Sequence, residues 1–108
     1  MKRIPYLLAA SAAALGLGAA AYAYDGEQYV TCHLNPDGDN FLALRTCPNS
    51  GCDMVKKLGP ATFVVTMEPH GTKGWREVIV QQNSQDWSYS GPKGWVFEKY
   101  ICLVDLSK

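Results

Sequence analysis

The residues best suited to chemistry in this chain are its four cysteines, Cys32, Cys47, Cys52 and Cys102. Cys47 and Cys52 enclose a Pro-Asn-Ser-Gly segment, and each of these residue types favours a tight turn. A turn of this length brings the flanking Cα atoms within the roughly 4.4–6.8 Å that a disulfide spans. Four cysteines allow three pairings. The turn favours Cys47–Cys52, which leaves Cys32–Cys102 to join the beginning of the folded chain to its end.

The competing chemistry for the cysteines is a four-cysteine zinc site. Structural zinc sites usually take their cysteines from two close-spaced pairs, whereas Cys32 and Cys102 each stand alone in this sequence. We therefore predict two disulfides, no metal and no cofactor. Oxidised cysteines are not nucleophiles, and His33 and His70 lie in no recognisable catalytic motif. The sequence therefore predicts a protein that is not an enzyme.

Two large aromatic residues, Trp87 and Tyr89, lie in a polar segment of Asn, Ser, Gln and Asp. Side chains of this kind combine a large contact area with one polar group, and they are frequent in binding hot spots. Burial of Trp87 would carry Asp86 and Ser88 toward the interior, at a cost of about 1–3 kcal/mol for each unpaired polar group. We expect Trp87 to stay partly exposed. The alternative is that both rings fold back over an open end of the domain.

The first residues differ in composition from the rest of the chain. A basic Met-Lys-Arg start precedes an uncharged, Ala-rich and Leu-rich run from Ile4 to Ala23, which ends in Ala-Tyr-Ala. This combination is typical of a secretory signal peptide. An uncleaved membrane anchor is the alternative, although the glycines and alanines make the run only weakly hydrophobic. We predict a cleaved signal peptide over 1–23, one domain over 24–108 and a periplasmic or secreted location, where disulfides persist.

The predicted mature domain is small and nearly neutral. Cleavage removes Lys2 and Arg3, which leaves eight basic and ten acidic residues and a formal charge of −2. Nucleic-acid binding calls for a basic face, and an anionic membrane surface attracts a polybasic segment. We therefore expect neither partner, and we expect a monomer. A domain of this size gains limited stability from its core, so the disulfides matter.

Short β-branched and aromatic runs fill this domain, separated by turn signals. The expected strands cover 29–34, 41–45, 62–67, 75–80, 94–97 and 101–104. A single helical turn is expected at 98–100, and 53–58 fits either a helical turn or an irregular strand. Turn signals recur every 8–12 residues or so, which is typical of a small all-β antiparallel barrel or sandwich.

Four short stretches resemble, in order, the motifs of bacterial Src homology 3 (SH3) domains. They are Leu42-Ala43-Leu44-Arg45 followed by Pro48, Trp75-Arg76-Glu77-Val78, Gly94-Trp95-Val96, and Tyr100-Ile101. The resemblance covers 29–104 and implies a small SH3-like antiparallel β-barrel. Two features depart from the family pattern: Cys47 stands where the family often has glycine, and the loop around Trp87 is longer than usual.

The resemblance implies a binding module, because bacterial members bind peptidoglycan peptides or protein segments. We expect recognition of an envelope protein or a peptidoglycan peptide in a groove between the Cys47–Cys52 loop and the Trp87 loop. The place of Trp95 and Tyr100 in these motifs implies a role in the core or at the rim of the barrel. An inhibitor or immunity protein that caps an envelope enzyme or toxin is the alternative, and a structural subunit is a third option. The expected ligand-binding residues are Trp87, Tyr89, Arg45, Asn49 and Tyr100.

Overall fold

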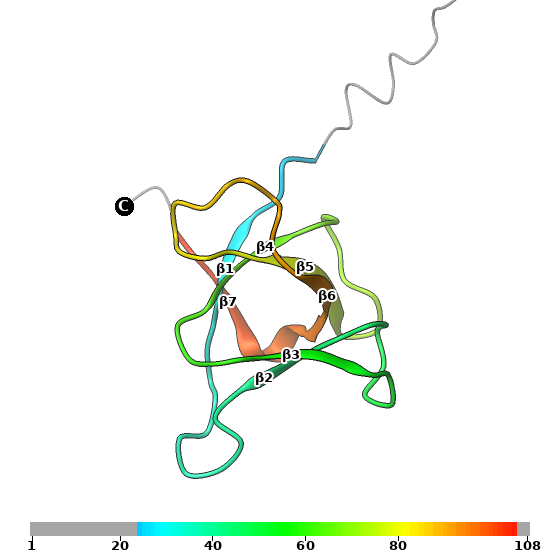
Figure 1. The fold of residues 1–108 in the computed structure, drawn as a ribbon. Coiled ribbons are helices and arrows are strands. Elements are labelled where there is room, and N and C mark those ends of the chain that lie inside the picture. The colour runs from blue at the N-terminus through cyan, green and yellow to red at the C-terminus, as the bar shows by residue number, and fades with distance from the viewer. Residues whose placement is uncertain (1–23, 106–108) are drawn as a thin grey trace, which may run out of the picture.

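The computed structural model describes residues 24–105, which form one antiparallel seven-stranded sheet. The elements are β1 (Gln28–Thr31), β2 (Leu42–Arg45), β3 (Met54–Leu58), β4 (Phe63–Thr66), β5 (Trp75–Val80), β6 (Lys93–Phe97), the 3₁₀ turn η2 (Glu98–Tyr100) and β7 (Ile101–Leu103). Their order across the sheet is β3-β2-β6-β5-β4-β1-β7 (Figure 1). The all-β class expected from the sequence is therefore confirmed. The predicted signal peptide over 1–23 lies outside the described residues.

Most predicted strands lie within two residues of their expected bounds. The segment 53–58, ambiguous in sequence, contains strand β3, and the expected helical turn is η2. The first strand ends at Thr31 rather than at Leu34. The reason is local, because His33 adopts a left-handed φ of 59° that cannot continue a strand.

The sheet curls around one apolar core. The core cluster takes residues from every strand except β1, whose Tyr29 packs against it: Leu42, Leu44, Leu58, Val64, Val78, Val80, Val96 and Ile101. Strands at both ends of the sheet therefore contribute to the same interior, and Figure 1 shows the ribbon bent around it. Within residues 24–105 the end strands β3 and β7 are not paired with each other, so the sheet is strongly curved but not closed.

Alternation along the strands decides which aromatic residues enter the core. In β6, Gly94 and Val96 are buried, so Trp95 faces the other side of the sheet and is only half-buried. Its partners in register there are Arg45 and Glu77. Trp95 is therefore not a member of the core cluster, and of its two expected places only the barrel rim remains. The neighbouring Gly94 faces the core instead, and its lack of a side chain lets β6 pass close to Leu44 and Arg45 of β2.

The two predicted disulfides are both present, and among the described residues no cysteine is free. Cys32–Cys102 joins the residue after β1 to β7, with Cα atoms 5.9 Å apart. Cys47–Cys52 closes the turn between β2 and β3, with Cα atoms 5.7 Å apart. No helix in this part of the chain is long and apolar enough to cross a membrane.

Arg76 is an unexpected member of the interior, with 6% of its surface exposed. Its guanidinium donates to the hydroxyl of Tyr29 at 3.2 Å and to the carbonyls of Glu68 at 3.1 Å and Pro69 at 3.2 Å. It also lies over the Tyr29 ring, 5.3 Å from the centroid. These contacts hold the loop that leads into β5, and they thereby fix the position of the first residue of that strand, Trp75.

Candidate functional site

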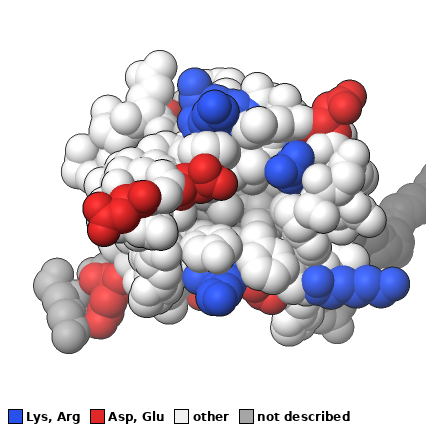
Figure 2. All heavy atoms as spheres, turned by 90° about the horizontal axis from the view of Figure 1, so that it is seen from below, with Lys and Arg blue, Asp and Glu red and all other residues white. Residues whose placement is uncertain are grey.

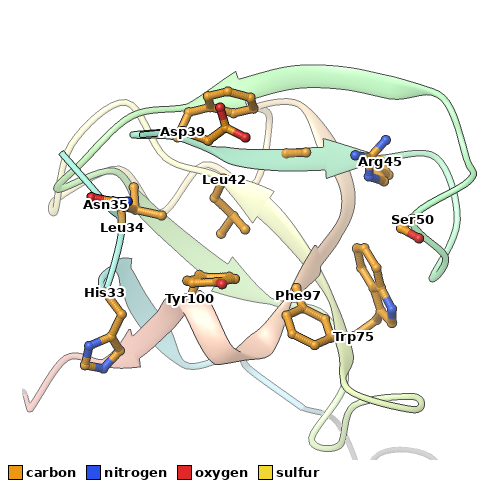
Figure 3. Close-up of a pocket in the computed structure, with 12 residues that line it drawn as sticks. His33, Leu34, Asn35, Asp39, Leu42, Arg45, Ser50, Trp75, Phe97 and Tyr100 are labelled. Carbon is orange, nitrogen blue, oxygen red and sulfur yellow. The ribbon is translucent and has the colours of Figure 1, made fainter. Parts of the chain in front are cut away.

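A hollow of about 740 Å³ lies between β2, the loop after β1 and the η2 turn (Figure 3). Pockets of roughly 300–1,000 Å³ are typical of small-ligand sites. The residues that line it are His33, Leu34, Asn35, Asp39, Phe41, Leu42, Ala43, Arg45, Ser50, Trp75, Phe97 and Tyr100. They come from segments far apart in the sequence, which the curled sheet brings together at one side of the molecule.

Three aromatic rings form the floor of this hollow. Trp75 and Phe97 are partners in the β5–β6 register, and their rings meet at 65° with centroids 5.4 Å apart. The η2 turn then brings Tyr100 beside Phe97, with centroids 6.1 Å apart. Phe97 keeps 37% of its surface exposed, and Figure 3 shows the three rings in a row below β2. The floor is therefore a continuous and accessible apolar surface.

The wall opposite this floor has polar groups of opposite charge at its two ends. Phe41, Leu42 and Ala43 supply the apolar middle of the wall. Figure 3 shows Arg45 near the Trp75 end of the hollow and Asp39 toward the other end. An extended ligand lying along the floor would therefore meet a cation at one end and a carboxylate at the other.

Arg45 also fixes the rim of the hollow. Its guanidinium donates to the carbonyl of Cys52 at 2.9 Å, so it ties β2 to the Cys47–Cys52 loop. Within that loop the side-chain oxygen of Asn49 accepts from the N–H of Gly51 at 2.7 Å. Ser50 reaches the hollow, but Asn49 does not line it. Asn49 therefore acts within the turn, and its predicted contact with a ligand stays a prediction.

The Trp87 loop lies elsewhere. It connects β5 to β6 and is on the far side of the molecule from the Cys47–Cys52 loop (Figure 1). Trp87 and Tyr89 are 41% and 46% exposed, so the exposure expected from their polar neighbours is present. Neither ring lines the hollow that contains Arg45 and Tyr100. The structure therefore does not join the two loops around one groove, because the β5–β6 register places Trp75 and Phe97, which line the hollow with Ser50, at the end of the hairpin away from the Trp87 loop.

Hydrogen bonds order the Trp87 loop. The Asp86 carboxylate accepts from the N–H of Gln82 at 2.9 Å and from the N–H and hydroxyl of Ser88 at 3.1 and 2.6 Å. The bond from Gln82, followed by those from Ser88, lowers the pKa of Asp86 below its ordinary value. The hydroxyl of Tyr89 donates to the carbonyl of Asp25 at 2.6 Å. Both aromatic rings are thus displayed on a loop whose shape is set.

The short sequence motifs do not predict most of the aromatic floor. Trp75 and Phe97 fall in expected strands, and neither is among the expected ligand-binding residues. The signal that could have found them is their pairing across the β5–β6 hairpin, which places Trp75 opposite Phe97. The long polar connection between these strands hid that register, because hairpin register is readable only when the turn is short.

Charge contributes little to selection over the face shown in Figure 2. Acidic and basic side chains are intermixed there, and neither sign covers a large continuous area. A ligand in the hollow would accordingly be selected by apolar contact and by a few placed polar groups rather than by a strong field.

Comparison with known proteins identifies no family for this chain. The sequence matches no protein-family model, and no curated protein is significantly similar to it. The function of this chain must therefore be inferred from the geometry of the hollow and from the short motifs described above.

Proposed function

We propose that the chain is an exported, non-catalytic binding module with an SH3-like barrel, and that it holds a peptide or a peptidoglycan stem peptide in the hollow. The observation that carries the proposal is the row of Trp75, Phe97 and Tyr100 along its floor. Support for the barrel comes from the curled sheet with one core and from the four SH3-like motifs, which fall on β2, on β5, on β6 and across η2 and β7.

The three rings suit an extended chain better than a compact small molecule. They present one partly exposed apolar strip rather than an enclosed pocket. Aromatic side chains of this kind supply contact area with little loss of conformational entropy. Peptidoglycan stem peptides carry both carboxylates and amines, so Arg45 is suited to a ligand carboxylate and Asp39 to a ligand amine.

We propose binding without catalysis because the cysteine thiols, which would be the obvious nucleophiles, are oxidised to disulfides. The four cysteines are joined in two disulfides, and a thiolate is needed for nucleophilic attack. The same disulfides support export to an oxidising compartment, in keeping with the signal-like N-terminal run. The partner proposed is therefore an envelope protein segment or a cell-wall peptide.

The experiment is a calorimetric titration of the purified protein with a synthetic stem tetrapeptide. We expect Trp75→Ala to weaken binding by about 2 kcal/mol, on the scale of a hot-spot residue. The matched control is Trp87→Ala, which removes an equally large ring from the loop outside the hollow and should leave the affinity unchanged. No binding by the wild type, or equal losses in the two variants, would count against the proposal.

A protein partner is the second candidate, and the Trp87 loop is the observation that favours it. Trp87 and Tyr89 are exposed, 6.4 Å apart between centroids, and held by hydrogen bonds, as in a preorganised anchor. An inhibitor or immunity protein would use this loop to cap an envelope enzyme or toxin. Affinity capture with periplasmic extract separates the two functions: a partner retained by Trp75→Ala and lost by Trp87→Ala belongs to the loop, whereas the reverse belongs to the hollow.

A further inference from the structure

Three potential metal ligands converge at one end of the hollow, beside β7. They are the sulfurs of Cys32 and Cys102 and a ring nitrogen of His33, and these atoms all lie within 4.8 Å of one another. The Nε2 atom of His33 is 3.5 Å from the Sγ atom of Cys102. His33 also lines the hollow, but the peptide contacts proposed above do not use the two sulfurs.

The backbone directs His33 toward the sulfurs. Its φ of 59° is left-handed, a conformation that few residues other than glycine adopt, although His is enriched among them. The turn ends β1, and the His33 ring lies beside β7 (Figure 3), where its Nε2 atom is within reach of Cys102 Sγ. The imidazole remains exposed, as the burial pattern of the segment shows, so an ion could reach it from solvent.

We propose that reduction of Cys32–Cys102 converts this group into a site for a zinc-type divalent cation. The ligands are the two thiolates and the His33 imidazole, and a water occupies the fourth position. With Zn–S near 2.3 Å and Zn–N near 2.05 Å, a tetrahedral site needs ligand separations of about 3.6 Å between nitrogen and sulfur and about 3.8 Å between sulfurs. His33 Nε2 and Cys102 Sγ already lie 3.5 Å apart, so the adjustment falls on Cys32, whose sulfur must move away from Cys102 and settle at a similar distance from the imidazole, within a cluster that spans 4.8 Å.

The chemistry has two balanced steps. A phosphine reductant cleaves the sulfur–sulfur bond, takes the oxygen of one water to become the phosphine oxide, and leaves the two hydrogens on the thiols. A divalent cation then displaces two protons from these thiols and accepts the neutral imidazole as its third ligand. The resulting ion joins the end of β1 to β7, which is the link that the disulfide supplies in the oxidised protein.

The other cysteine pair does not offer the same set. Of the groups described for residues 24–105, the convergent cluster of three ligating side chains contains Cys32, His33 and Cys102, and it does not include Cys47 or Cys52. Replacing Cys47 and Cys52 with serine therefore isolates the proposed site. This double variant is the background for the test.

The test is a titration with Co²⁺, whose absorption reports both thiolate ligation and coordination geometry. The double variant is reduced with a water-soluble phosphine, freed of reductant without oxygen, and titrated. We expect a sulfur-to-cobalt charge-transfer band that saturates at one ion per chain. His33→Ala should weaken binding by more than about tenfold, since even changes to outer-shell partners cost 10–100-fold. The matched control His70→Ala changes an exposed loop histidine and should leave the affinity unchanged.

Reduction could unfold the chain, so far-UV circular dichroism is recorded during the same titration. The proposed metal site is then tested by whether the ion restores the fold. If the reduced chain is unfolded, Zn²⁺ should restore the β-sheet spectrum at one equivalent, and His33→Ala should abolish that recovery. The proposal is overturned by the absence of a charge-transfer band, by equal affinities of His33→Ala and His70→Ala, or by failure of Zn²⁺ to restore an unfolded reduced chain.

Discussion

The ring of Trp75 meets the ring of Phe97 edge to face, and their centroids are 5.4 Å apart. The two residues are opposite each other in the β5–β6 register, so the sheet fixes this contact. The buried guanidinium of Arg76 holds the loop just before Trp75, and the η2 turn begins directly after Phe97. Rigid backbone on both sides thus positions the two rings that begin the aromatic floor.

Phe97→Ala tests whether this floor binds ligand. The side chain is 37% exposed and contacts rings on both sides. Its removal should weaken stem-peptide binding by about 1–2 kcal/mol, the scale of an interface aromatic. Because the ring lies at the surface, the melting temperature should fall by only a few degrees or so. Calorimetric titration and thermal melts of the same sample measure both effects; a large fall in melting temperature with unchanged affinity would contradict the assignment.

Much of the fold could be predicted from local sequence. Alternation in β2 places Leu42 and Leu44 inside, and the Pro-Asn-Ser-Gly turn indicates the Cys47–Cys52 bridge that the structure contains. These features depend on neighbours in the chain. The orientation of Trp95 cannot be predicted from its neighbours in the chain. Either face of β6 could have pointed into the core, and Gly94 takes the inner face because the space there is too crowded for a side chain.

Gly94→Ala tests that crowding. A Cβ atom built at Gly94 would lie 2.6 Å from the carbonyl oxygen of Arg45 and 2.9 Å from the Cγ atom of Leu44. The strands must separate to accept it, so we expect a loss of about 1–3 kcal/mol in the free energy of unfolding. The matched control is Gly59→Ala, since a Cβ there meets no atom within 4 Å. Urea denaturation should show a lower midpoint for Gly94→Ala alone; equal midpoints would mean that β2 and β6 are not closely packed at this point.

The two disulfides should differ in their contribution to stability. Cys32–Cys102 closes a loop with a sequence separation of 70, and Cys47–Cys52 one of 5. By loop entropy, replacement of the long bridge with two serines should cost roughly 4 kcal/mol and replacement of the short one roughly 2 kcal/mol. Denaturant midpoints of the two double variants measure this. A larger loss at the short bridge would show that the β2–β3 turn, rather than the β1–β7 connection, limits stability.

Asp86 should make the Trp87 loop sensitive to acid. Its pKa in the folded chain is lowered from an ordinary value of 3.8 by hydrogen bonds to the ionised carboxylate. This stabilisation is therefore fully present above about pH 4 and is lost as the pH falls through the folded pKa. The difference in free energy of unfolding between wild type and Asp86→Ala should shrink between pH 6 and pH 3. Urea titrations at the two pH values measure it, and a difference that stays constant would contradict the proposed role of the carboxylate.

The candidate site was only partly predictable, for a physical reason. Arg45 and Tyr100 belong to recognisable short motifs, and both line the hollow. Trp87 and Tyr89 are expected binding residues because exposed aromatic residues in polar loops are common binding anchors, and they are indeed exposed. Their distance from the hollow follows from the β5–β6 register, which places Trp75 and Phe97 at the end of the hairpin away from the connecting loop. No local pattern encodes that register.

The most direct test of the central claim is nuclear magnetic resonance mapping of the bound peptide. Amide shifts of the ¹⁵N-labelled protein are followed while the stem tetrapeptide is added. If the aromatic floor is the binding site, the largest shift changes will fall on 33–45, on Trp75 and on 97–100, while 83–90 stays unchanged. Shift changes concentrated on 83–90, with the lining of the hollow unaffected, would contradict it.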